Sequence, residues 1–238
     1  MAKAKKDKES KDRKEKSKLK GAKRVLVNIL LDKSGSMASV LNDTIGGFNT
    51  YISALKKEAG IDYLFSLTLF DTVIQNRYVA EPIAKIPELS TKNYIPDGGT
   101  ALYDAIGCTV RNVDRNKPDA EKILTVIMTD GEENSSREWN LSGIQALIKQ
   151  KEDEGNWTFV FLGAQPDAWA VGQQMGVAAK NMAQYDPVRS TGTFAAMASA
   201  TNAYSHVADA RSEDVMALAP RKMRTAAGLR VPGLDKRK

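Results

Sequence analysis

Four oxygen-bearing side chains follow two short apolar runs that lie far apart in the chain. Asp32, Ser34 and Ser36 come directly after one run, and Asp130 follows the other. Apolar runs of this length are typical of buried strands in a parallel sheet. Open α/β sheets bind ligands at the carboxyl ends of such strands, where the strand order reverses. Because carboxylate and hydroxyl oxygens suit Mg²⁺, Mn²⁺ or Ca²⁺ and not zinc, the sequence predicts a divalent cation site at that edge.

A glycine-rich loop supplies a fifth candidate ligand. Residues 97–100 read Asp-Gly-Gly-Thr, and the two glycines let the backbone turn sharply and approach a ligand closely. Thr100 stands at the start of an expected helix, so its hydroxyl is placed either to cap that helix or to coordinate an ion. Turn formation and helix capping are likewise the alternative roles of Ser34, Ser36 and Asp130.

The elements that must position these residues alternate along the chain. Strands are expected at 24–31, 63–70, 73–79, 123–129, 157–163 and 177–182, and helices at 38–59, 100–116, 141–154, 167–175 and 190–209. Only Asp71 and Thr72 join the second strand to the third, and so short a link requires antiparallel pairing. The order predicts a doubly wound, Rossmann-like α/β fold, with a six-stranded, mostly parallel sheet, one antiparallel edge strand and helices on both faces.

The five candidate ligands together resemble the metal-ion-dependent adhesion site of von Willebrand factor A domains. That pattern is Asp-x-Ser-x-Ser, a threonine after two glycines, and an aspartate in Thr-Asp-Gly, and the resemblance covers roughly residues 23 to 210. It implies that the hydroxyls of Ser34 and Ser36 bind the ion directly and that Thr100 binds it directly or through water. It also implies that Asp32 and Asp130 act mainly through waters.

The same resemblance implies a function. Neutral hydroxyls around the ion, with the carboxylates one layer further out, leave the cation electrophilic and one coordination position open. A protein partner that offers a Glu or Asp carboxylate fills this position. The expected function is therefore a non-catalytic, Mg²⁺-dependent (or Mn²⁺- or Ca²⁺-dependent) protein-interaction module of bacterial or phage style.

Charge is distributed unevenly along the 238 residues. The net charge is +6, but residues 1–24 carry +8 and residues 212–238 carry +4, so the intervening body carries −6. We expect a basic, disordered arm at 1–23, one domain at 24–210 and a basic tail at 211–238. The alternative function is weak binding of nucleic acid or another polyanion through the basic tails, which lack the interleaved aromatic residues of a base-stacking platform.

Several classes of protein do not fit the composition. Cys108 is the single cysteine, which excludes an intramolecular disulfide and a cysteine-based zinc or iron-sulfur centre. No apolar run reaches the length of a membrane span, and the run before Asp32 is too short for a signal sequence. We therefore expect a cytoplasmic protein without membrane contact. His206 is the single histidine, and no ligand or catalytic role is expected for it.

An enzyme is the less favoured alternative. Phosphatases of the haloacid-dehalogenase type also end a strand with a metal-binding aspartate, but they carry a second aspartate at the position of Ser34. A phosphate-binding Gly-x-x-x-x-Gly-Lys-Ser/Thr loop is not present in the sequence. A metal-dependent phosphatase-type activity is therefore kept only as a minor alternative.

Five further residues near the strand ends each have two possible roles. Glu132, Glu133 and Asn134 either extend the acidic rim around the ion or belong to an ordinary exposed loop. Trp139 and Trp169 either pack in the core, which is the favoured reading, or contribute to a binding surface.

Overall fold

A computed structural model describes residues 23–116, 118–207 and 214–234 of the chain. Its centre is a six-stranded sheet with the order β3-β2-β1-β4-β5-β6. The strands are β1 (Lys23–Asp32), β2 (Ile61–Phe70), β3 (Ile74–Pro82), β4 (Lys122–Thr129), β5 (Trp157–Gly163) and β6 (Met182–Gln184). Neighbours pair in parallel except β2 and β3, which pair antiparallel at one edge. The predicted fold class is confirmed.

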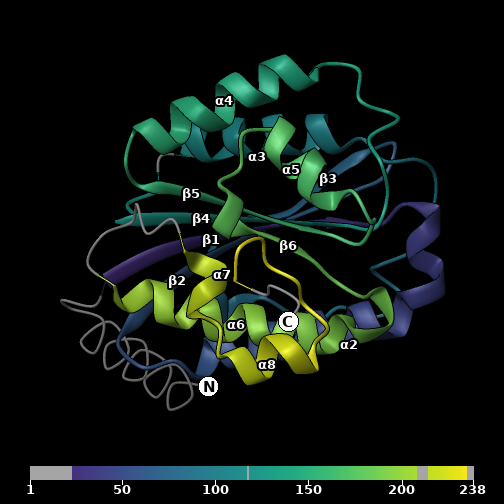
Figure 1. Cartoon of the computed structure of the whole chain (residues 1–238). Coiled ribbons are helices and arrows are strands. Elements are labelled where there is room, and N and C mark those ends of the chain that lie inside the picture. Colours follow the sequence, from purple (N-terminus) through teal and green to yellow (C-terminus); the bar gives the residue numbers. More distant parts are fainter. Residues whose placement is uncertain (1–22, 117, 208–213, 235–238) are drawn as a thin grey trace, which may run out of the picture.

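Helices cover both faces of this sheet (Figure 1). One face carries α3 (Leu102–Asn116), α4 (Leu141–Asp153) and α5 (Ala168–Gln174), and the other carries α2 (Leu41–Lys57) and α6 (Ser190–His206). Side chains of β1 alternate between the two layers, so Leu26 and Leu30 pack beneath α3 while Val27 and Ile29 face α2 and α6. None of the described helices has the length and apolar character that crossing a lipid bilayer requires.

The topology brings two strand ends together. Leu31 of β1 lies opposite Met128 of β4 in a parallel register, so the loops that follow these strands leave the same edge of the sheet. The chain order reverses between β1 and β4, because β2 lies on one side of β1 and β5 lies on the far side of β4. This is the crevice at which doubly wound sheets bind ligands.

Most predicted boundaries shift by up to three residues, and two elements differ in kind or place. The first helix begins as a 3₁₀ turn, Gly35–Val40, before it becomes regular in α2. The last strand is Met182–Gln184 and not 177–182, because residues Ala179–Asn181 form another 3₁₀ turn that carries the chain to the sheet edge. The remaining short turns are η2 (Ile83–Lys85) and η4 (Pro187–Arg189).

The segment that ends the described chain packs onto the domain. The sequence predicts a basic tail from residue 211, but α7 (Val215–Leu218) and α8 (Arg221–Ala226) lie against the face that α2 and α6 cover. Val215 and Leu229 are fully or almost fully buried in that core layer, and Arg230 forms an antiparallel bridge with β6. Apolar side chains between the basic ones explain this packing. The predicted arm lies almost wholly outside the described residues.

Candidate metal centre

Asp32 is the most constrained residue at the strand edge. It ends β1 and is completely buried. Its Oδ1 accepts a hydrogen bond from the Ser34 N–H (2.6 Å), and its Oδ2 accepts one from the Thr129 hydroxyl of β4 (2.5 Å). The Tyr94 hydroxyl donates to the Asp32 carbonyl (2.6 Å). Groups from three separate segments therefore fix the position of this carboxylate.

The two serines connect Asp32 to the loop after β4. Ser34 Oγ lies 3.1 Å from Ser36 Oγ, and the Ser36 hydroxyl donates to Asp130 Oδ1 (2.6 Å). Ser34 is buried, whereas Ser36 is exposed at the mouth of the crevice. The hydroxyls of both serines thus lie between the two carboxylates.

Thr100 reaches the same place from the glycine-rich loop. Its backbone N–H donates to Asn134 Oδ1 (2.8 Å), and its carbonyl accepts from the N–H groups of Asn134 (3.0 Å) and Ser135 (3.2 Å). These bonds hold Thr100 against the loop that follows β4. Its hydroxyl has no hydrogen-bond partner in the part of the chain that the structure describes, although only 2% of the residue is exposed.

Gly131 shows how closely the candidate ligands converge. A Cβ atom at this position would lie 2.7 Å from Thr100 Oγ1, 3.5 Å from Asp32 Oδ2 and 3.6 Å from Ser34 Oγ. Three oxygens, two from the end of β1 and one from the glycine-rich loop, therefore face one small volume, and a side chain at residue 131 would enter it. The five predicted ligands are all brought together at this edge of the sheet.

The loop after β4 is tied to α3 through Glu133 and Trp139, whereas its Glu132 is exposed. The carboxylate of Glu133 accepts hydrogen bonds from Tyr103 N at the start of α3 (3.0 Å) and from Ser135 N (2.9 Å). Trp139 packs on α3, because a Cβ at Gly107 would lie 2.2 Å from its indole nitrogen. Glu133 and Trp139 thus tie this loop to α3. Trp169, by contrast, is 38% exposed.

The electrostatics of the site favour a cation. Burial raises the pKa of Asp32 to about 6 against the lowering effect of its hydrogen bonds, and burial also raises the pKa of Asp130. Lys33, which stands between two candidate ligands, forms its buried ion pair with Asp71 instead. Within the described ranges no lysine or arginine pairs with Asp32 or Asp130. Two carboxylates with raised pKa values therefore lack a positive charge beside them.

Hydroxyl oxygens are essential to any ion bound here. Among the described residues, no three His, Cys, Asp or Glu side chains lie close enough together to hold a metal. A cation at this edge would depend on the hydroxyls of Ser34, Ser36 and Thr100 in addition to the two aspartates. This donor set consists of oxygen only, which suits Mg²⁺, Mn²⁺ or Ca²⁺.

Four residues that position the site were not predicted. Thr129 belongs to the Thr-Asp-Gly segment, and its place at the end of a strand beside β1 is a signal that sequence reasoning could have used. Tyr94 and the Lys33–Asp71 pair depend on contacts between segments that are remote in the sequence. No local pattern indicates those contacts.

Solved structures that are similar to this chain are distant in sequence. The von Willebrand factor domain of the type V pili tip protein Mfa5 from Porphyromonas gingivalis has a TM-score of 0.58 and 12% identity, over 79% of this chain and 98% of that one. A von Willebrand factor type A structure from Catenulispora acidiphila has a TM-score of 0.54 and 17% identity, over 76% of this chain and 43% of that one. Manganese-loaded TRAP from Plasmodium vivax has a TM-score of 0.50 and 16% identity, over 72% and 73% of the two chains.

These likenesses concern the fold. The chain spans less than half of the Catenulispora structure. No protein-family model and no curated protein sequence matches it. The sheet order, the antiparallel edge strand and the structural likenesses agree, and the chain therefore has the fold of von Willebrand factor A domains.

Proposed function

We propose that the chain is a non-catalytic protein-interaction module that works through a divalent cation. Mg²⁺, or Mn²⁺ or Ca²⁺ in its place, binds to Asp32, Ser34, Ser36, Thr100 and Asp130. The observation that carries this proposal is the convergence of three oxygens on Gly131, where the absence of a side chain keeps the space between them open.

The chemistry of the donors supports a cation in that space. When bound, the ion supplies a positive acceptor for a carboxylate of the partner protein. Ser34 and Thr100 provide neutral oxygens, so they do not cancel its charge. Asp32 and Asp130 provide the negative charge that attracts it. The Thr100 hydroxyl is free to turn toward the ion, because Glu133 and Ser136 already bind the backbone N–H groups of Tyr103 and Asp104 in the first turn of α3.

The surroundings of Asp32 argue for binding and against phosphatase-type catalysis. A nucleophilic aspartate must expose a carboxylate oxygen to the substrate. Asp32 is buried, and its two oxygens accept hydrogen bonds from Ser34 N and the Thr129 hydroxyl. This supports the role of a fixed negative charge behind the ion.

The test begins with the metal alone. Titration of the full chain with MnCl₂, followed by electron paramagnetic resonance of free Mn²⁺, should give one site that Asp32→Ala and Ser34→Ala each weaken strongly. Asp153→Asn, which changes an exposed carboxylate on α4, is the matched control and should leave the affinity unchanged. Binding that persists in both site variants would contradict the proposed ligand set.

The partner is tested by affinity capture in Mg²⁺ and in chelator. Capture through a metal–carboxylate contact should be lost with chelator and should persist at raised salt. Binding of a polyanion through basic tails should instead weaken steeply with salt and ignore chelator. The second pattern would favour the alternative function over the one proposed.

A further inference from the structure

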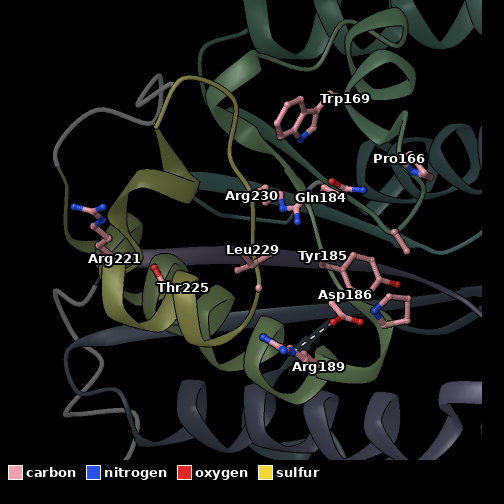
Figure 2. A pocket seen from close by; sticks show the side chains of 13 residues that line it. Pro166, Trp169, Gln184, Tyr185, Asp186, Arg189, Arg221, Thr225, Leu229 and Arg230 are labelled. Carbon is pink, nitrogen blue, oxygen red and sulfur yellow. Dashed lines mark ion pairs between the residues drawn. The ribbon is translucent and has the colours of Figure 1, made fainter. Parts of the chain in front are cut away.

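A second cavity adjoins the candidate metal centre at the same edge of the sheet. It has a volume of about 940 Å³ and lies where β5 and β6 end, between α5 and α8 (Figure 2). The segment that follows β5 forms part of its wall. Because β4, β5 and β6 are parallel neighbours, this wall and Asp130 leave the sheet on the same side.

Direct contacts join the cavity to the metal centre. Ala164, which lines the cavity, donates its N–H to the Thr129 carbonyl (3.1 Å), and the Gln165 side chain donates to the Asp130 carbonyl. The side chain of Gln184, another lining residue, donates to the Gln165 carbonyl (3.1 Å). The loop after β5 is thus shared by the cavity and the metal centre.

Tyr185 connects the two places as well. It lines the cavity, yet its hydroxyl is buried and has no hydrogen-bond partner in the described part of the chain. Burial raises the pKa of Tyr185, and the neighbouring charges of Asp130 and Asp32 raise it further. The charges of the metal centre therefore lie close to the wall of the cavity.

The cavity is basic, although the body of the domain is acidic. Arg189, Arg221 and Arg230 line it, and Asp186 is the one carboxylate among its lining residues. Arg189 pairs with Asp186 (3.4 Å), whereas Arg221 and Arg230 form no ion pair with the described residues. Residues 25–211 carry a net charge of −6, so two unpaired arginines here form a local positive surface.

The arrangement of these groups fits an extended peptide better than a single phosphate. Figure 2 shows Arg221 and Arg189 separated across the cavity, with Arg230 between Trp169 and Leu229. Positive charges spread along a cavity suit successive side chains of a polypeptide, whereas one phosphate requires donors that converge on a point. Trp169, which is 38% exposed, offers an apolar face beside them.

We propose that this cavity, defined by Arg221, Arg230 and Trp169, binds the partner segment whose first carboxylate binds the metal ion, and that Arg230 pairs with a second acidic residue of that segment. The inference rests on the proposed function and adds the class of partner, an extended segment with two acidic residues. Strands lie about 4.8 Å apart, so β6 and the bridged Arg230 lie roughly 10 to 15 Å from the end of β4. An extended chain covers about 3.3 to 3.6 Å per residue, which places the second acidic residue about three to five positions from the first.

Selection from a random-peptide display library in Mg²⁺ tests this spacing. Wild type should enrich peptides with two acidic residues at that separation. Arg221→Gln/Arg230→Gln should enrich peptides with one acidic residue only, and a synthetic two-acid peptide should bind it several-fold more weakly than it binds wild type. Arg77→Gln, an exposed arginine of β3 at the opposite sheet edge, is the control and should select as wild type does. Equal thermal unfolding of the variants checks that each is folded.

The outcomes separate this inference from the proposed function. If wild type enriches peptides with a single acidic residue, or if the double arginine variant still enriches spaced pairs, the cavity does not bind a second acidic residue. The metal-dependent function would still stand in that case. If wild type enriches no acidic peptide, or if enrichment ignores chelator, the proposed function itself fails. If a fluorescent ATP analogue binds saturably to wild type and not to the double arginine variant, the cavity is a nucleotide site and the proposal of a peptide ligand is wrong.

Discussion

Replacing Asp32 with asparagine should stabilise the metal-free protein and abolish its response to metal. Burial raises the pKa of Asp32 from its ordinary value of 3.8 to about 6. Each pH unit between the two values corresponds to about 1.4 kcal/mol, so the charged carboxylate lowers the free energy of unfolding by about 3 kcal/mol at neutral pH. Asparagine has the same shape and no charge, so Asp32→Asn should recover most of that free energy.

The hydrogen bonds around residue 32 accommodate this change. The amide oxygen can accept from the Ser34 N–H as the carboxylate does. The amide nitrogen can donate to the Thr129 hydroxyl, whose own hydrogen can turn to the Gly131 carbonyl, 3.1 Å away. No buried polar group is left without a partner, so the electrostatic gain should dominate the measured difference.

Urea unfolding in chelator, repeated across pH, measures the effect. The folded state holds the Asp32 proton more tightly than the unfolded state, so this group stabilises wild type at low pH and the contribution is lost as pH rises from about 4 to 6. The variant should therefore match wild type below about pH 4 and exceed it above about pH 6. Saturating Mg²⁺ should stabilise wild type alone, by about 2.7 kcal/mol at a hundredfold excess over the dissociation constant.

Asp119→Asn is the matched control, because its side chain is fully exposed and its contact with Arg24 is loose (3.4 Å). This variant should unfold as wild type does at every pH and should keep the response to Mg²⁺. A destabilised Asp32→Asn in chelator at neutral pH, or a variant that Mg²⁺ still stabilises, would refute the reasoning.

Three further predictions concern the same edge of the sheet. Gly131→Ala should weaken Mn²⁺ binding about tenfold or more in an electron paramagnetic resonance titration, because the added Cβ displaces the Thr100 hydroxyl. Unchanged affinity would contradict the proposal that the ion binds beside residue 131. Thr100→Ala should reduce partner capture as chelator does, with little added loss when the two are combined, since both act on one interaction; additive losses would place the hydroxyl elsewhere. Lys33→Met should cost about 3 to 5 kcal/mol in urea unfolding, because it leaves the Asp71 carboxylate buried and unpaired, and a loss below about 1 kcal/mol would show that water reaches it.

The sheet could be predicted because its signals are local. Val25 to Leu31 and Ile123 to Met128 are apolar runs of strand length, and their positions in the structure match the prediction closely. Asp71 and Thr72 dictated the antiparallel edge by chain geometry alone. The short strand β6 has no such run. It pairs with Arg230, in a segment that is predicted to be a tail because of its net positive charge.

The role of the Thr100 hydroxyl shows where sequence reasoning stops. The sequence places Thr100 at a helix start and leaves two roles open, helix capping and coordination. Capping depends on which groups reach the free N–H groups of α3, and these groups belong to residues thirty or more positions later in the chain. The Glu133 carboxylate accepts from Tyr103 N and the Ser136 hydroxyl accepts from Asp104 N, so the loop after β4 takes over the capping role. The Thr100 hydroxyl is therefore not needed as a cap and faces Gly131. The loop after β4, which the sequence indicates only as an exposed loop, thus leaves this hydroxyl available to coordinate an ion.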